Sequence, residues 1–330
     1  MNDIEIKIKL EIEKAKHILL HCHPSPDPDS VGSALAMKLA LEQIGKKVSL
    51  IKGDSEIPKA FVFPGVDTIV QKNFFEIDIK DFDLFIILDS GSIDMISRKG
   101  NVVFPESLMT IVMDHHVSNK GYGKINHVDA NYSSTSELLY DLFRKIDIQI
   151  NHDIALNLFM GMYTDTGGFR YGESGVKTLK VASELALLAP DYQKTIFIME
   201  NNNTKESLIF ESMLLSSLNM YFDGKLALAY VSHNDLIKNN IKEDNRFTGY
   251  ISNKLKSIIG VEIAGTLIEV NPNEVKLSFR SRDVKNYDIS RLASALGGGG
   301  HKAAAGATIK ISLPEAIEKV VKIIKELYNI

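Results

Sequence analysis

The feature that most constrains the fold is a set of short apolar runs, several of which lead directly into acidic or histidine residues. The runs are His17–Cys22 (HILLHC), Lys47–Lys52 (KVSLIK), Leu84–Asp89 (LFIILD) and Leu108–Asp114 (LMTIVMD). Such continuous runs are typical of strands that are buried on both faces of a parallel sheet. Helical spacing follows over Ser30–Ile44, with Asp29 or Ser30 as the expected N-cap. We therefore expect a Rossmann-like α/β domain whose functional residues lie at the carboxyl ends of its parallel strands.

The rest of the chain predicts more helices and then a second, smaller α/β domain. Helical patterns cover Ser134–Ile146, His152–Tyr163, Val176–Leu188 and Glu206–Leu218. Strand patterns cover Leu226–Val231, Ile263–Val270 and Val275–Arg280, and an Asn-Pro-Asn turn joins the last two as a hairpin. We expect a first domain over 1–190, a helical linker over 191–220 and a second domain over 221–330.

Composition limits the class of protein and its partners. The 330 residues carry a formal charge of −4 and are 45% apolar, so no overall positive field attracts long nucleic acid. Cys22 is the only cysteine, which excludes an intrachain disulfide and a cysteine zinc site. No apolar run approaches the roughly 20 residues that span a bilayer. We expect a cytoplasmic protein that does not bind membranes, and a homodimer is compatible with the sequence.

The residues that follow the apolar runs have the chemistry of a metal site. They are His23, Asp27, Asp29, Asp89, Asp114, His115, His116 and Asp165. If the fold brings these aspartates to one sheet edge, their carboxylates repel each other strongly unless cations lie among them. Two aspartates that are one residue apart in an extended segment point to opposite sides and reach different ions. The pattern predicts a two-metal hydrolase.

A glycine run in the second half of the chain has the chemistry of an anion site. The sequence GGGGHKAAAGA occupies 297–307, after a short helical stretch. Backbone amides at Gly299 and Gly300, together with the side chains of His301 and Lys302, can receive a terminal phosphate. The element is therefore suited to bind an anion.

Taken together, the motifs resemble those of the DHH phosphoesterase superfamily. The segments HPSPDPD, LDSGS, MDHH and YTDTG occur in the family's order, and GGGGHKAAAGA resembles the signature of the accompanying DHHA1 domain. The two matches extend from about His21 to Ala307. Within the superfamily, the chain looks most like the nano-RNases and phosphatases of 3′-phosphoadenosine 5′-phosphate (pAp).

This resemblance implies roles for individual residues. His23 and Asp27 are expected to bind one Mn²⁺, and Asp29, His115 and Asp165 a second, with Asp89 between the two ions. The donor set is also compatible with Co²⁺, Fe²⁺ or Zn²⁺. Asp114 is expected to orient an imidazole, and His116 to face the phosphate as a donor or general acid. Arg280 matches an arginine of the DHHA1 pattern and is expected to bind phosphate, with Arg282 as a weaker candidate.

The expected activity is hydrolysis of very short RNA to mononucleotides and of pAp to AMP. A cleft that holds both ends of the substrate would favour oligonucleotides of about two to five nucleotides. One alternative is the same chemistry on pApA or cyclic di-AMP in second-messenger turnover. Another is a nucleotide-binding regulator without catalysis, and inorganic pyrophosphatase is a weaker rival because that group has a different second domain.

Other conspicuous side chains are expected to have structural roles. His17, His21, His127, His152 and His233 lie outside the motifs and are interpreted as cap, surface or packing residues. Cys22 is expected to be a small core side chain. Tyr163 and Phe169 are expected to pack in the core rather than stack on a base.

Overall fold

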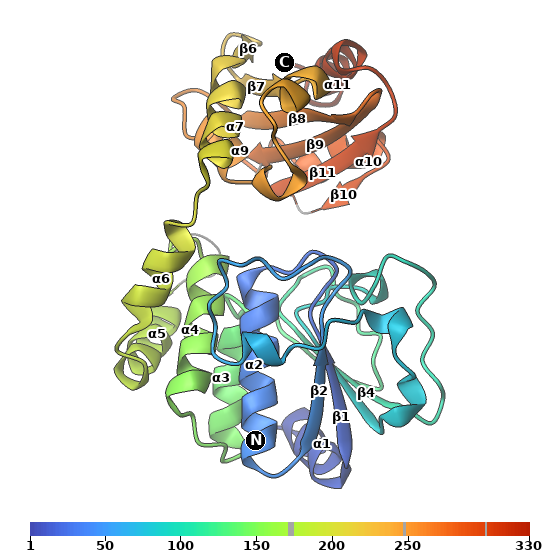
Figure 1. Ribbon diagram of the computed structural model, residues 1–330, viewed down its shortest axis with the longest axis vertical. Helices are drawn as coiled ribbons and strands as arrows, with labels where there is room; N and C mark the ends of the chain where they lie inside the picture. Colours follow the sequence, from blue (N-terminus) through green and yellow to red (C-terminus); the bar gives the residue numbers. More distant parts are fainter. Residues whose placement is uncertain (171–174, 247–248, 301) are drawn as a thin grey trace. The chain divides into compact units, whose positions relative to one another are not determined.

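The computed structural model describes residues 1–170, 175–246, 249–300 and 302–330, and it divides the chain into two compact units (Figure 1). The first unit comprises Met1–Asn202 and the second Asn203–Ile330. Helix α6 (Tyr192–Glu200) lies in the first unit, and helix α7 (Lys205–Ser216) lies in the second. The stretch 191–220, which the sequence predicts as a linker, is thus largely helical and is shared between the two units.

The first unit is built on a five-stranded parallel sheet, which confirms the predicted fold class. The strand order is β2-β1-β3-β4-β5. The strands are β1 His17–His21, β2 Lys47–Ile51, β3 Leu84–Leu88, β4 Met109–Asp114 and β5 Ile125–Val128. All five residues of β3 are buried, as its continuous apolar sequence predicts. The strand order also places the ends of β1, β3 and β4 next to one another at one edge of the sheet.

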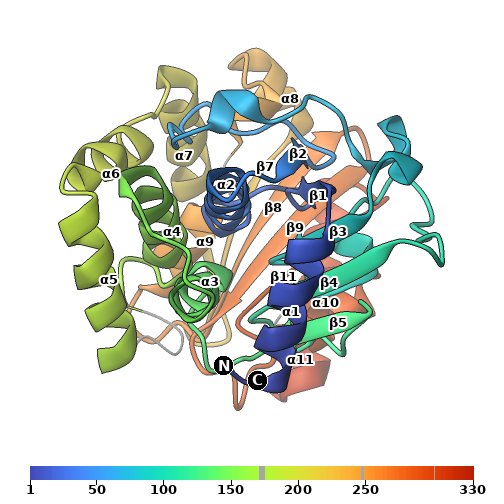
Figure 2. The ribbon, with the colours of Figure 1, turned by 90° about the horizontal axis from the view of Figure 1, so that it is seen from below.

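The two faces of this sheet are covered differently. One face packs against a helical layer, and successive strand residues alternate between that layer and the opposite face. The helices of this unit are α1 Asp3–Lys14, α2 Pro28–Gln43, α3 Thr135–Lys145, α4 His152–Asp165, α5 Val176–Leu188 and α6. Figure 2 shows α2, α3 and α4 grouped beside the sheet. The opposite face packs against a segment with short 3-10 turns, including Phe74, Ile96 and Val102.

Helix α2 begins before the position that the sequence predicts. The N-cap is Asp27, whose side chain accepts a hydrogen bond from the amide of Ser30, and Pro28 occupies the first helical position. The prediction of Asp29 or Ser30 as N-cap is therefore wrong, because Pro28 has the φ angle that a first turn requires. As a result Asp29 lies in the helix rather than in an extended segment.

The second unit is a six-stranded mixed sheet with helices on both faces. Its strand order is β10-β11-β9-β8-β7-β6, and only the β7–β8 pair is parallel. The strands are β6 Asn219–Tyr221, β7 Leu226–Val231, β8 Ile263–Asn271, β9 Glu274–Ser281, β10 Gly299–Gly300 and β11 Ala304–Ile309. The helices are α7, α8 His233–Lys238, α9 Gly249–Lys256, α10 Ile289–Ala295 and α11 Leu313–Tyr328. The predicted β8–β9 hairpin is confirmed.

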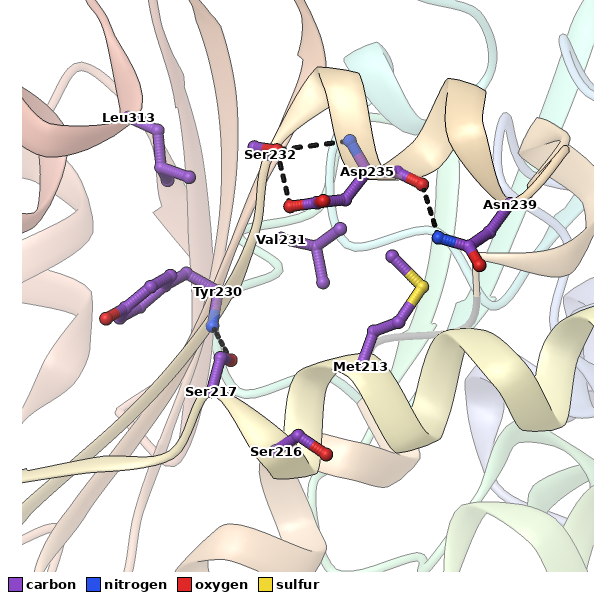
Figure 3. A pocket seen from close by; sticks show the side chains of 9 residues that line it. All are labelled: Met213, Ser216, Ser217, Tyr230, Val231, Ser232, Asp235, Asn239 and Leu313. Carbon is purple, nitrogen blue, oxygen red and sulfur yellow. Dashed lines mark hydrogen bonds between the residues drawn. The ribbon is translucent and has the colours of Figure 1, made fainter.

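A hollow of about 360 Å³ lies in the second unit between α7, β7, α8 and the start of α11 (Figure 3). Its polar groups largely bond to one another. The hydroxyl of Ser217 accepts from the amide of Tyr230, that of Ser232 donates to Asp235, and the amide of Asn239 donates to the carbonyl of Asp235 (Figure 3). The residues that the sequence singles out for chemistry do not line it. Among the described residues, no helix has the length and apolar character to cross a membrane.

Close packing of α2 on α4 depends on Gly32. A Cβ atom at this position would lie 2.5 Å from the main-chain oxygen of Asn157 on α4. Gly32→Ala should therefore force the helices apart and lower the free energy of unfolding by about 1–3 kcal/mol. Without the clash, the same change in a helix would raise it by about 1 kcal/mol. Urea unfolding of wild type and variant measures the sign of the change in the free energy of unfolding. A stabilised variant would show that the two helices do not require a glycine at this contact.

Candidate metal centre

Acidic and histidine side chains from the ends of three parallel strands and from two helices meet in the first unit. Asp89 directly follows β3, and His115 and His116 directly follow β4. His23 and Asp27 lie between β1 and α2, Asp29 lies in the first turn of α2, and Asp165 is the last residue of α4. Three groups have ligand atoms that lie within 4.8 Å of one another: His23–Asp27–Asp89, Asp29–His115–Asp165 and Asp89–His115–His116. Each group has the size and donor types of a metal site.

Asp27 and Asp29 belong to different groups, and the reason is the helix start. Asp27 caps α2 from an extended backbone conformation, while Asp29 has entered the helix. Their side chains therefore leave the backbone in different directions, although they are separated only by Pro28. The sequence interpretation of two outward-pointing residues on an extended segment is wrong in its geometry, but the two aspartates do reach separate groups.

Asp89 is a member of two of these groups. Its Oδ2 lies 3.9 Å from Nε2 of His23, while its Oδ1 lies 3.7 Å from Nε2 of His115 and 3.8 Å from Nδ1 of His116. Both histidines also contact a second aspartate. His23 Nε2 lies 3.1 Å from Asp27 Oδ2, and His115 Nε2 lies 3.3 Å from Asp165 Oδ2. A carboxylate whose two oxygens face opposite donor groups is suited to contact a cation on each side.

The electrostatics of the centre favour positive charge. Asp89 is only 3% exposed, and its burial together with the charges of Asp29, Asp27 and Asp165 raises its pKa well above the ordinary value. Burial and the charge of Asp29 also raise the pKa of Asp165, to about 8. A divalent cation among these carboxylates would lower their pKa values again and stabilise their ionised form. The donor set thus fits divalent cations, with oxygen ligands and a few imidazoles.

Asp114 has a different environment from the other acids. It is fully buried, and its Oδ1 accepts hydrogen bonds from Nδ1 of His116 at 2.7 Å and from the amide of His115 at 3.0 Å. Burial opposes a charged imidazole, but the hydrogen bond and charge of Asp114, together with the charges of Asp165 and Asp29, outweigh burial and raise the pKa of His116. Asp114 therefore orients His116 and favours its protonated form, which can donate a hydrogen bond.

Two polar residues that the sequence pattern did not indicate hold the segments that follow β3 and β4. Asn119 donates to Oδ2 of Asp114 at 2.7 Å and to the carbonyl of Ser90 at 3.2 Å. The Tyr122 hydroxyl donates to the same Ser90 carbonyl at 2.8 Å. These bonds hold the chain just after Asp89, whose φ of 49° lies in the left-handed region that a non-glycine residue seldom adopts. A polar loop residue carries no periodic signal, so the sequence pattern did not indicate them.

In the second unit, the predicted substrate-binding residues lie on β9 and on or after β10, two strands that both pair with β11. Arg280 of β9 pairs with Ala304 of β11, is half-buried, and donates to the carbonyl of Phe279 at 2.9 Å. Gly299 and Gly300 form the exposed strand β10, and Lys302 is also exposed. His301 lies outside the described residues.

The glycines of this element also have a structural role. A Cβ at Gly300, where φ is 137°, would lie 2.6 Å from the Cα of Ala305 on the paired strand. The guanidinium of Arg282 donates to the carbonyl of Lys256, the last residue of α9, and to that of Ile258, the latter at 2.7 Å. These hydrogen bonds give the Arg282 side chain a structural role that does not require a bound phosphate. Burial first, and then the charges of Arg280 and Arg282, lower the pKa of Lys256, which marks a local concentration of positive charge.

Several of the residues interpreted as structural lie in packed surroundings, whereas His152 is exposed. Cys22 is fully buried. His21 is buried edge-on to Phe85, and burial together with the nearby His23 lowers its pKa to about 3, so it stays neutral. Tyr163 and Phe169 pack against one another, with ring centroids 6.1 Å apart.

Comparison with known families identifies both units. A family model described as the N-terminal domain of the DHH family matches residues 17–162, and one described as the DHHA1 domain matches 224–329. The first match contains every donor of the centre except Asp165, which lies just beyond it. The second contains Arg280 and the glycine run.

Several curated relatives are named as enzymes that cleave phosphoester bonds. The chain is 26% identical to the bifunctional oligoribonuclease and PAP phosphatase NrnA of Thermus thermophilus over 303 residues, which cover 90% of this chain and 86% of that protein. It is also 26% identical to the cyclic-di-AMP phosphodiesterase PdeA of Listeria monocytogenes over 260 residues, which cover 75% of this chain but 36% of that protein.

Among solved structures, an exopolyphosphatase-related protein from Bacteroides fragilis is similar over 98% of this chain and 96% of its own, with a TM-score of 0.87 and 26% identity. Both family models match, in order, and they cover the motifs HPSPDPD, LDSGS, MDHH and GGGGHKAAAGA, while YTDTG begins directly after the first match. The chain therefore belongs to the DHH family of phosphoesterases and carries a DHHA1 domain after its DHH domain.

Proposed function

We propose that this phosphoester hydrolase uses Mn²⁺ to degrade very short RNA to mononucleotides and to remove the 3′ phosphate of pAp. The observation that carries the proposal is the Asp89 carboxylate, whose two oxygens face separate groups of metal-binding side chains. The names of relatives such as the NrnA protein of Thermus thermophilus support the choice of substrate.

The donors of the centre are assigned to two cation sites. His23 and Asp27 would hold one cation, and Asp29, His115 and Asp165 would hold the other. Asp89, which lies near His23 on one side and His115 on the other, would serve both sites. When bound, the cations supply positive charge to the phosphoryl oxygens and make a water more acidic, so that water is the nucleophile.

Two further elements handle the substrate's phosphates. His116, held by Asp114 in its protonated form, donates a hydrogen bond to the scissile phosphate. A terminal phosphate binds to the guanidinium of Arg280, the ammonium of Lys302 and the backbone amides of the glycine element, which comprises Gly299, Gly300 and the following His301.

A second candidate function is the hydrolysis of pApA or cyclic di-AMP. The similarity to the PdeA protein of Listeria monocytogenes favours it, and the chemistry at phosphorus is the same. A third candidate, of another class, is a nucleotide-binding regulator. The complete set of acidic and histidine donors speaks against that candidate, since a regulator has no need of them.

A substrate panel separates these functions. Purified protein with Mn²⁺ is given pAp, pApA, cyclic di-AMP, a 5′-phosphorylated trinucleotide and pyrophosphate, and kcat/KM is measured for each. We expect pAp and the trinucleotide to be the best substrates, and we expect a chelator to stop all turnover. Preference for cyclic di-AMP or pApA would favour the second candidate, and tight binding without turnover would favour the regulator. Equal rates on a dinucleotide, a pentanucleotide and a long RNA would refute the preference for short RNA.

Asp89→Asn should abolish turnover without unfolding the protein. The amide has nearly the same shape but cannot contact two cations as an anion, so kcat should fall by more than about a hundredfold. The change also removes a buried negative charge, so thermal stability in chelator should not decrease. The exposed Asp67→Asn is the matched control and should have wild-type activity. Wild-type turnover by Asp89→Asn would eliminate the proposed role of this carboxylate.

Without metal, stability should fall as the pH rises through the neutral range. The pKa of Asp165 is raised from 3.8 to about 8 and that of Asp89 is raised well above 3.8, so between those values the folded state binds more protons than the unfolded state. Burial lowers the pKa of His21, His115 and His127 and gives the opposite slope below about pH 6.5, the ordinary histidine pKa. Thermal unfolding in chelator should therefore show a melting temperature that decreases between about pH 6.5 and pH 8. Mn²⁺ should largely remove this slope. A melting temperature that rises with pH over this range in chelator would contradict the crowding of these acids.

A further inference from the structure

Thr135, the first residue of α3, contacts the metal centre from a fully buried position. Its amide donates to Oδ2 of Asp29 at 2.8 Å, and its hydroxyl donates to Oδ1 of Asp89 at 3.1 Å. Asp29 and Asp89 belong to different donor groups of the centre. A single residue therefore holds one acid from each group through two different atoms.

The surroundings of Asp29 are fixed on several sides. Its Oδ1 accepts a hydrogen bond from the amide of Ser136 at 3.1 Å. Both carboxylate oxygens therefore accept hydrogen bonds from main-chain amides at the start of α3. The start of a helix favours negative charge, and main-chain donors cannot rotate away as side chains can. On α4, a Cβ at Gly161 would lie 2.5 Å from Oδ1 of Asp29, so the helix approaches the carboxylate as closely as glycine allows. Asp29 has little freedom to move.

The surroundings of Asp89 are less restrictive. Within the part of the chain that the structure describes, the hydroxyl of Thr135 donates a hydrogen bond to its carboxylate, and three imidazole nitrogens lie 3.7 to 3.9 Å from its oxygens. Threonine is restricted in its χ1 rotation, and the residue's backbone is held by the Ser134 cap and by Asp29. Its hydroxyl therefore transmits the fixed position of Asp29 to Asp89.

We propose that Thr135 is a positioning residue that sets the separation of the two cation sites, an inference that rests on the proposed two-metal function. The amide anchors the ligand of one site, and the hydroxyl orients the carboxylate shared with the other. If the hydroxyl is removed, Asp89 is free to turn toward either group, and the two ions lose their fixed spacing. Partners of this kind commonly change metal affinity by about 10- to 100-fold.

The test is Mn²⁺ binding to the full chain without substrate. Thr135→Val removes the hydroxyl and keeps the shape and the amide, whereas Thr135→Ser keeps both hydrogen bonds. Thr110→Val is the matched control, because Thr110 is 2% exposed and its hydroxyl accepts from the amide of Lys124, outside the centre. Calorimetric titration gives the affinity for each ion, and electron paramagnetic resonance reports magnetic coupling between two neighbouring Mn²⁺ ions.

We expect wild type, Thr110→Val and Thr135→Ser to bind two ions with a coupled spectrum. Thr135→Val should bind at least one ion about 10- to 100-fold more weakly and lose the coupled signal. Circular dichroism in chelator shows whether each variant folds. If Thr135→Val does not fold, Thr135→Ala, which also lacks the hydroxyl, takes its place in the comparison with Thr135→Ser.

Two outcomes overturn the inference. One is a folded Thr135→Val or Thr135→Ala protein with wild-type affinities and a coupled spectrum. The other is a Thr135→Ser protein as impaired as Thr135→Val, since that would indicate packing rather than the hydroxyl. Failure of the proposed function gives a different result, because the wild-type protein itself would then bind no pair of Mn²⁺ ions and would not hydrolyse the substrate panel.

Discussion

The first unit is organised around an electrostatic conflict at the carboxyl edge of its sheet. Asp89 is almost fully buried, and the charges of Asp29, Asp27, Asp165 and Asp114 raise its pKa well above normal. Burying like charges together costs free energy that packing alone does not return. The surrounding fold supplies many fixed donors for these acids, and divalent cations would complete the compensation. A fold that carries such a conflict is suited to binding a ligand of opposite charge.

Rigid elements hold the acids in place. Asp27 is bonded to the first turn of α2, Asp29 to the start of α3, and Asp114 to Asn119 and His116. Main-chain amides at helix starts serve twice, since they need acceptors and the carboxylates need donors. The same contacts that satisfy the ends of the helices therefore fix the geometry of the centre, which is why the site is built on helices and strand ends rather than on long loops.

The structure also shows where sequence patterns mislead. Asp3–Lys14 alternates apolar and charged residues, which is a strand-like pattern, yet it forms helix α1. An Asn2–Glu5 capping box begins the helix, and Ile8 and Ile12, four residues apart, are buried in the core. The Glu5 carboxylate also bonds to Lys145 of α3 at 2.7 Å. The tertiary contacts of one helical face outweigh the alternating pattern, and Ile4, Ile6 and Leu10 remain exposed as a result.

The sequence by itself determined the parallel sheet and the identity of the residues at its edge. Continuous apolar runs such as LFIILD must be buried on both faces, and the carboxyl ends of parallel strands necessarily share one edge. Only the tertiary structure decided how those residues meet. The two oxygens of Asp89 point to separate groups, and Thr135 bonds to Asp29 across 106 positions of the chain. The physical reason is that such hydrogen bonds depend on how helices pack on the sheet, to within a few tenths of an ångström, and local sequence does not encode that packing.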